Sequence, residues 1–146
     1  MRLYLGSDHA GYRLKNVLKE YAESLKIETT DLGVFEGGTR DYPDIAREVS
    51  EKVYENEGSF GLLVCGSGTG MCMAANKQKG IRAASCTNET LARYARAHNN
   101  ANVICMGERI VGEEVAKAML KVFLETPFEG GRHESRVEKI NQMDHE

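Results

Sequence analysis

The chain has 146 residues, of which 41% are hydrophobic and 28% are charged, and its formal net charge is −3 at pH 7. These proportions are typical of a folded globular protein and argue against extended disorder. The small negative charge gives no electrostatic basis for nucleic-acid binding, although a local arginine cluster can still hold an anion.

Strand-like and helix-like patterns alternate along the whole chain, with glycine-rich breaks between them. In chain order the pattern predicts a strand over 2–6, a helix over 14–25, a strand over 26–32, a helix after Pro43, a strand over 60–65, a short helix over 71–76, a strand over 81–85, a helix over 88–98, a strand over 102–106, a helix over 115–123 and a helical tail from about Arg132.

Five strands joined by helical crossovers predict an α/β fold with a parallel sheet covered on both faces. We therefore expect residues 1–146 to form a single domain, a three-layer α/β/α sandwich of flavodoxin-like or Rossmann-like order followed by a C-terminal helical tail. For five strands the flavodoxin-like order 2-1-3-4-5 is favoured. It makes the first and third strands neighbours, so that the loops 6–11 and 65–70 meet at the edge where ligands bind.

No apolar run approaches the roughly 18 residues of a membrane-spanning helix. The opening run Met1–Gly6 reaches Ser7 and Asp8 too soon for a secretory signal. The cysteines are widely spaced and form no C-x-x-C pair, which favours reduced thiols over disulfides or a zinc site. We expect a cytoplasmic protein without a membrane partner, in which Cys72, Cys86 and Cys105 are small core residues.

The strongest local signal is the segment Cys65-Gly66-Ser67-Gly68-Thr69-Gly70. Alternating glycines allow successive backbone N–H groups to face one concavity, which can hold a phosphate or an oxyanion. The segment is not a dinucleotide-binding fingerprint, because it lacks the third glycine of that motif. It is not a Walker loop either, because it lacks the lysine of that motif. A tight turn without a ligand is the structural alternative.

Cys65 ends a strand beside this loop, where a thiol can act as a base or a nucleophile. An inert buried cysteine explains the same position. Asp8 and His9 follow the first strand, where they can orient hydroxyls or move a proton, or where Asp8 can simply cap a helix and leave His9 solvated.

The remaining candidates lie in the second half of the chain. His98 and Asn99 close a helix, a place where such residues are common without any further role. Arg132 and Arg136 are four residues apart on one helix face, and with Arg109 they could hold a phosphate dianion or belong to a solvated tail. The four histidines are scattered along the sequence, so we expect no metal site.

Taken together, these segments resemble the ribose-5-phosphate isomerase B family, which includes the galactose-6-phosphate isomerase subunits. The resemblance extends nearly from end to end and rests on ordered blocks: Gly6-Ser-Asp-His-Ala-Gly11, Asp41-Tyr-Pro43, Cys65-Gly-Ser-Gly-Thr-Gly70, Ala75-Asn-Lys77, Gly80-Ile-Arg-Ala83, His98-Asn99, Asn102-Val103, Gly107-Glu-Arg109 and Glu129-Gly-Gly-Arg-His133. One small departure is Ser67, where many members have threonine.

The resemblance implies an aldose–ketose isomerase that needs no cofactor, with Cys65 as general base and His98 as the acid–base group that opens the sugar ring. It assigns substrate-binding roles to Asp8, His9, Gly66, Ser67, Gly68, Thr69, Gly70 and Asn99, and phosphate-binding roles to Arg109, Arg132 and Arg136. It also implies a homodimer, or a dimer of dimers, with the site at the subunit interface.

Topology supports the last expectation. His98 precedes the fifth strand and so lies at the amino edge of the sheet, away from the crevice beside Cys65. If His98 is catalytic, it most simply serves a partner's crevice across a two-fold axis.

Three other functions explain part of the sequence. A hexose 6-phosphate is an alternative substrate to ribose 5-phosphate, because the sequence does not reveal the depth of the substrate pocket. A non-catalytic nucleotide-binding module would explain the glycine loop, residues 66–70, but not the cysteine and the paired arginines. A thiol phosphatase would use Cys65 as nucleophile, but its phosphate loop would need a closing arginine where Met71 stands.

Overall fold

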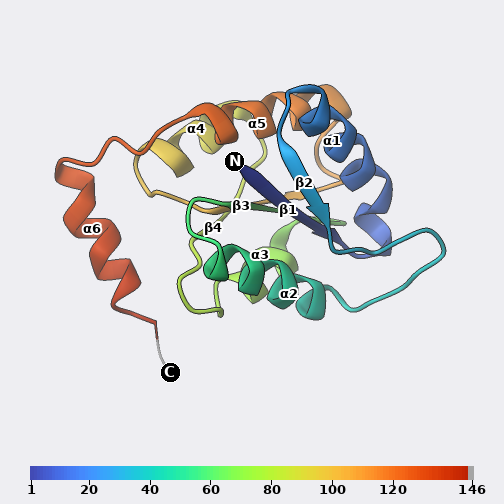
Figure 1. Ribbon diagram of the computed structural model, residues 1–146, viewed down its shortest axis with the longest axis horizontal. Coiled ribbons are helices and arrows are strands. Elements are labelled where there is room, and N and C mark those ends of the chain that lie inside the picture. Colours follow the sequence, from blue (N-terminus) through green and yellow to red (C-terminus); the bar gives the residue numbers. More distant parts are fainter. Residues whose placement is uncertain (145–146) are drawn as a thin grey trace.

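Five parallel strands form one sheet in the computed structural model, which describes residues 1–144 (Figure 1). The strands are β1 (Arg2–Ser7), β2 (Glu28–Asp31), β3 (Phe60–Cys65), β4 (Ala83–Ser85) and β5 (Val103–Gly107). The helices are α1 (Tyr12–Ser24), α2 (Tyr42–Glu55), α3 (Thr69–Ala75), α4 (Glu89–Ala97), α5 (Glu113–Glu125) and α6 (Arg132–Asn141), with a short 3₁₀ turn, η1, at His9–Gly11. The predicted α/β fold class is confirmed.

The three central strands are buried on both faces because apolar side chains or glycine occupy nearly every position along them; Arg2 and Ser7, at the two ends of β1, are the polar positions. In β3, Leu62 and Val64 face one helical layer, while Leu63 and Cys65 face the other. This alternation is the period-2 geometry of a strand, and a strand covered on both sides needs apolar residues at both phases. The sheet therefore has two apolar cores.

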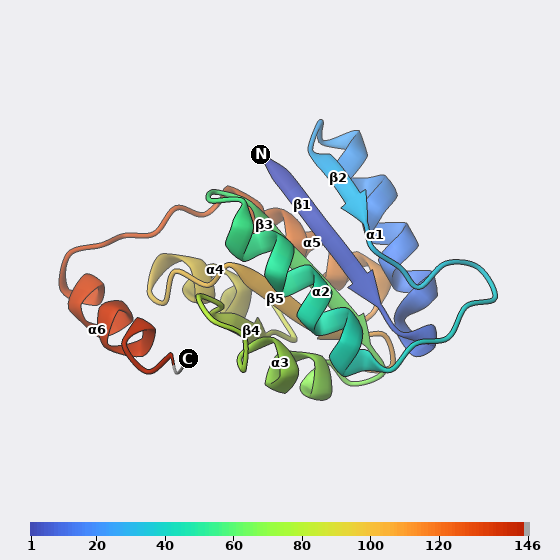
Figure 2. The same ribbon diagram turned by 60° about the horizontal axis from the view of Figure 1, so that its bottom comes forward.

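Each core is closed by its own helices (Figure 2). The apolar residues of α1, α4 and α5 pack on the face that carries Leu62, and those of α2 and α3 pack on the face that carries Leu63. Local signals begin two of these helices: Pro43 lies in the first turn of α2, and Asn88 accepts a hydrogen bond of 2.9 Å from the Leu91 amide at the start of α4.

The strand order is β2-β1-β3-β5-β4, so the predicted placement of the fourth strand beside the third is wrong. All five residues of β5 are buried, whereas none of the three residues of β4 is fully buried. A short, half-covered strand suits the edge of a sheet, and a fully apolar strand suits its centre. As a result, the loop after β5, rather than the loop after β4, lies beside the glycine loop.

Helix α6 lies apart from the two helical layers, at the end of an extended segment that leaves α5 (Figures 1 and 2). The C-terminal end of α6 contacts the amino edge of the sheet, where the Arg82 guanidinium donates a 3.0 Å hydrogen bond to the Asn141 side chain. Across residues 1–144, no helix combines the length and apolarity needed to cross a membrane.

A buried ion pair connects α1 to the end of β2. The Lys15 side chain is fully buried, and its ammonium lies 2.8 Å from Asp31 Oδ1 and 2.6 Å from the Val34 carbonyl oxygen. Because the charged nitrogen has no access to water, it depends on these oxygens for its solvation. The pair therefore holds the segment after β2 in place.

We expect Asp31→Asn to destabilise the protein by about 3–5 kcal/mol, since it leaves the buried Lys15 ammonium without a countercharge. Glu28→Gln is the matched control, because Glu28 is an exposed partner of Arg2 at 2.8 Å and such pairs contribute about 0–1 kcal/mol. Urea unfolding followed by circular dichroism measures both. Equal midpoints for the two variants would show that the Lys15–Asp31 pair does not stabilise the fold.

Candidate active site

A cavity of about 460 Å³ opens where the loops after β1, β3 and β5 meet at the carboxyl edge of the sheet. It is lined by Asp8, His9, Ala10, Tyr42, Cys65, Gly66, Ser67, Gly70, Arg109 and Ile110. The two loops that the sequence placed at this edge, 6–11 and 65–70, thus do lie together. Most of the predicted binding residues of the first half of the chain are in this cavity.

The glycine loop, residues 66–70, folds back onto the end of β5 with no room for side chains between the two backbones. A Cβ atom on Gly107 would stand 2.4 Å from the Ser67 carbonyl carbon, and one on Gly68 would stand 2.9 Å from that of Met106. Gly68 also has a φ of 86°, a left-handed conformation that favours glycine. These contacts and this φ angle fix the backbone conformation of the loop.

Two backbone hydrogen bonds attach the loop after β5 to the end of β3 and the start of the glycine loop. The amide of Glu108 donates to the Cys65 carbonyl at 2.9 Å, and the amide of Arg109 donates to that of Gly66 at 3.0 Å. The Glu108 carboxylate in turn accepts a 2.7 Å hydrogen bond from the Leu14 amide in the first turn of α1. These hydrogen bonds join β3, the loop after β5 and α1 around Cys65.

Cys65 lies at the inner wall of this cavity. Its residue is 5% exposed, and the Gly68 amide donates a hydrogen bond of 3.1 Å to its Sγ. A backbone donor aimed at sulfur fixes the direction of the thiol while leaving it at the cavity wall. The position suits a proton-transfer group that must meet a small ligand.

Asp8 has the capping role that was the structural alternative for it, and it also lines the cavity. Its Oδ1 accepts hydrogen bonds from the amides of Ala10, at 3.0 Å, and Gly11, at 3.1 Å. These two bonds orient the carboxylate at the edge of the cavity. His9 beside it is exposed.

Arg109 and Tyr42 form the other side of the cavity. The Arg109 guanidinium covers Gly66, since a Cβ atom built there would stand 3.1 Å from its Nη1. The Tyr42 ring packs more closely on Gly70, 2.5 Å from such an atom. Tyr42 was not among the predicted site residues, and its only signal in the sequence is its place in the family-like block Asp41-Tyr-Pro43.

The predicted residues of the second half lie elsewhere. His98 follows α4 at the amino edge of the sheet, as expected, and Arg132 and Arg136 are exposed on α6. Asn99 is exposed and borders a separate hollow with Ile140 of α6. One chain therefore brings Cys65, Asp8, His9 and Arg109 together, but does not bring His98, Asn99, Arg132 or Arg136 to them.

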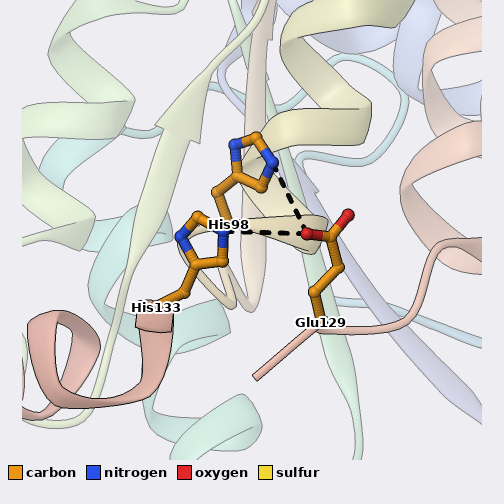
Figure 3. A group of neighbouring side chains, drawn as sticks. All are labelled: His98, Glu129 and His133. Atoms are coloured by element: carbon orange, nitrogen blue, oxygen red, sulfur yellow. Dashed lines mark ion pairs between the residues drawn. The ribbon is translucent and has the colours of Figure 1, made fainter. Parts of the chain in front are cut away.

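His98 belongs to a group of its own with Glu129 and His133 (Figure 3). Glu129 Oε1 lies 3.7 Å from His98 Nε2 and 3.6 Å from His133 Nε2. The His98 ring is stacked between Tyr94 and His133, with ring centroids 4.6 Å and 4.4 Å away. His98 and His133 are far apart in the sequence, and they meet because the segment before α6 returns to the end of α4.

The pKa of His133 is lowered from its ordinary value. Desolvation is the main cause, followed by the positive charge that His98 carries when protonated and by the guanidinium of Arg132. Glu129 opposes this effect. The group therefore favours a neutral His133 imidazole.

The chain belongs to a known family over most of its length. The model of the Ribose/Galactose Isomerase family matches residues 3–140. The chain is 38% identical to the ribose-5-phosphate isomerase B of Escherichia coli, across 98% of this chain and 96% of that one. It is 41% identical to the galactose-6-phosphate isomerase subunit LacA of Staphylococcus aureus, across 98% of this chain and 99% of that one.

This protein is a member of the ribose/galactose isomerase family. It is thereby placed among the sugar-phosphate isomerases, and the resemblance drawn from the sequence is confirmed. The crystal structure of the Clostridium thermocellum ribose-5-phosphate isomerase B superimposes with a TM-score of 0.94 at 42% identity, covering 98% of this chain and 97% of that chain. The family fold is therefore preserved here throughout.

Cys72 is not the core residue that the sequence suggested. It is half-buried and borders a hollow on α3 with Thr69, Asn76 and Lys77. A hydrogen bond from the Cys105 thiol lowers the pKa of Cys72 to about 7, against the opposing effect of burial, and the Ser85 backbone adds to the lowering. Burial raises the pKa of Cys86 to about 11.

We expect Cys72 to be alkylated by iodoacetamide at a rate that rises through about pH 7 and levels off above it, because only the thiolate reacts. Cys86 should remain unlabelled over the same range. Peptide mass spectrometry of samples quenched at intervals gives the rate for each cysteine. A Cys72 midpoint near about pH 8.5, the value for a free thiol, would contradict the effect of Cys105.

Proposed function

We propose that this chain interconverts ribose 5-phosphate and ribulose 5-phosphate through an enediolate, with Cys65 as the general base. The observation that carries the proposal is the Cys65 thiol, set in the wall of a 460 Å³ cavity beside the glycine loop, Asp8, His9 and Arg109. A glycine-rich loop can stabilise negative charge, and a neighbouring base can take a proton.

The Cys65 thiolate removes the proton from C2 of the open aldose. The electrons of that C–H bond form the C1–C2 double bond, and the carbonyl electrons move to O1. Backbone amides and hydroxyls of the glycine loop stabilise the enediolate oxygens. The proton then returns from Cys65 to C1 while the O2 proton is transferred to O1, which yields the ketose. Every electron stays within the sugar, so the reaction requires no redox cofactor.

Sugar phosphates are mostly cyclic, so a second group must open the ring first. We assign this step to His98, which takes the proton of the anomeric hydroxyl and delivers it to the ring oxygen as the bond between C1 and that oxygen breaks. Because His98 and the Cys65 cavity lie apart in one chain, the assignment requires a partner chain. Asp8, His9 and Asn99 would then hold the sugar hydroxyls, and Arg109 would share the phosphate with Arg132 and Arg136.

A homodimer with the site at its interface is therefore part of the proposal. Large apolar side chains are exposed on α4, which precedes His98, and on α6: Leu91 and Tyr94 on α4, and Ile140 on α6. Tyr94 stacks on His98, and exposed apolar groups of this kind support a protein–protein interface. A two-fold axis would bring each His98 to the other chain's cavity.

A hexose 6-phosphate remains the second candidate substrate, favoured by the 41% identity to a galactose-6-phosphate isomerase subunit. The two substrates differ by one carbon, and such differences change binding by about 1–3 kcal/mol. Turnover of ribose 5-phosphate, allose 6-phosphate and galactose 6-phosphate, measured side by side, tests the choice. A higher kcat/KM for either hexose phosphate would replace ribose 5-phosphate in the proposal.

Cys65→Ala should lower kcat by about 10²–10⁴-fold while leaving the fold and sugar-phosphate binding intact, because it removes the proposed base and nothing else. Cys72→Ser is the matched control, since that thiol lies outside the cavity. Circular dichroism and calorimetric binding of ribose 5-phosphate check the fold and the affinity. A Cys65→Ala enzyme with a third or more of the normal turnover would eliminate Cys65 as the base.

Mixing inactive Cys65→Ala and inactive His98→Asn chains should restore activity if each site uses two chains. A random mixture at equal concentrations holds about one quarter of its sites with both residues intact, by counting under two-fold symmetry. Turnover per site should therefore recover to about a quarter of that of the unmodified enzyme, in step with subunit exchange followed by mass spectrometry. Complete exchange without recovered activity would mean that Cys65 and His98 do not form a shared site.

A further inference from the structure

We propose that His98, Glu129 and His133, hereafter the His98 cluster, form a binding site for Zn²⁺. One ligand atom from each residue can be chosen so that all three lie within 4.8 Å of one another (Figure 3). Two imidazole nitrogens and one carboxylate oxygen are the ligand set of several zinc sites that leave the fourth position open. Within one chain the cluster lies apart from the Cys65 cavity, whose lining contains none of these residues.

The backbone brings the three ligands together before any ion binds. The Glu129 amide donates a 3.0 Å hydrogen bond to the carbonyl of Ala97, the residue before His98. The His133 amide donates to the Gly130 carbonyl at 3.0 Å, which forms the first turn of α6. Each ligand is thus attached to an anchored segment, and binding needs side-chain rotation only.

The distances require a small contraction. In a tetrahedral site with bonds of about 2.0–2.1 Å, ligand atoms are about 3.3 Å apart. Glu129 Oε1 is already 3.7 Å and 3.6 Å from the two Nε2 atoms. The two rings are stacked at an interplanar angle of 12°, so at least one must turn for their in-plane lone pairs to meet at one point. His98, whose side chain is 33% exposed, has space to turn, and Glu129, at 57%, can follow it. The His133 side chain is only 12% exposed and stays in place.

The surrounding charges limit the affinity and select the ion. Arg132 and Arg136 lie near His133 and oppose a cation, while Glu129 supplies a single negative charge. An oxygen-seeking ion such as Mg²⁺ finds only one carboxylate here, whereas Zn²⁺ gains two imidazoles. We therefore expect Zn²⁺ to bind and Mg²⁺ not to bind at equal concentration.

An inhibitory effect of the ion rests on the proposed function. Zn²⁺ would occupy the Nε2 lone pair with which His98 is proposed to open the sugar ring. The enzyme should therefore keep full activity after exhaustive chelation and lose activity when Zn²⁺ is added. Binding itself does not depend on the role of His98.

The first experiment measures binding in the full-length protein by competition with a chromophoric chelator, with Zn²⁺ as the probe. Glu129→Gln and His133→Asn should each weaken one Zn²⁺ site per chain at least tenfold, since each removes a ligand. Glu134→Gln, which alters an exposed carboxylate on the same helix, is the matched control and should bind as the unmodified protein does. Unchanged affinity in both ligand variants would overturn the site.

Cysteines also bind Zn²⁺, so the ligands must be identified directly. In an NMR titration, Zn²⁺ should shift the imidazole signals of His98 and His133 and leave those of His9 in place. Shifts confined to cysteine signals would assign the ion to the thiols and overturn the site. Zn²⁺ that binds at the His98 cluster without inhibiting turnover would uphold the site and refute the role of His98 in the proposed function.

Discussion

The arrangement of the carboxyl edge depends on one steric constraint, the contact of the glycine loop with the end of β5. Gly68 and Gly107 let two backbones approach to distances at which a Cβ atom on either would collide with a carbonyl carbon. Such contacts leave no alternative packing, because backbone atoms cannot move aside as a flexible side chain can. The directions of the Cys65 thiol and of the Arg109 side chain both follow from this contact, together with the two hydrogen bonds beside it.

The opposite edge is organised by stacking. Tyr94, His98 and His133 form a column of three nearly parallel rings, and Glu129 lies beside two of them. Planar stacking orients an imidazole without blocking its nitrogens. The chain thus carries the proposed base, Cys65, at one edge of the sheet and the proposed ring-opening group, His98, at the other. A reaction that uses both can proceed only where two chains meet.

The fold was predictable because the apolar pattern is strong and local. Glycine and proline mark the ends of most elements, and the buried runs of β1, β3 and β5 can belong only to a sheet covered on both faces. The usual strand order of five-stranded sheets did not predict the order of β4 and β5, because this order depends on which of the two strands is covered by helices on both faces in the folded chain. The length of β4, three residues, and its partly polar neighbourhood were the available signs.

The candidate site was predictable where its residues follow strands and much less so where they follow helices. Asp8, Cys65 and Arg109 each lie at the end of a strand or within two residues after it, and parallel strands bring such positions to one edge. The His98 cluster arises because an extended segment of the chain returns past α4, and no sequence period encodes that return. This arrangement gives His98 two proposed uses. The Nε2 atom proposed to exchange a proton with a sugar is also the atom proposed to bind Zn²⁺, so the two proposals together predict a reaction that needs no metal and that Zn²⁺ inhibits.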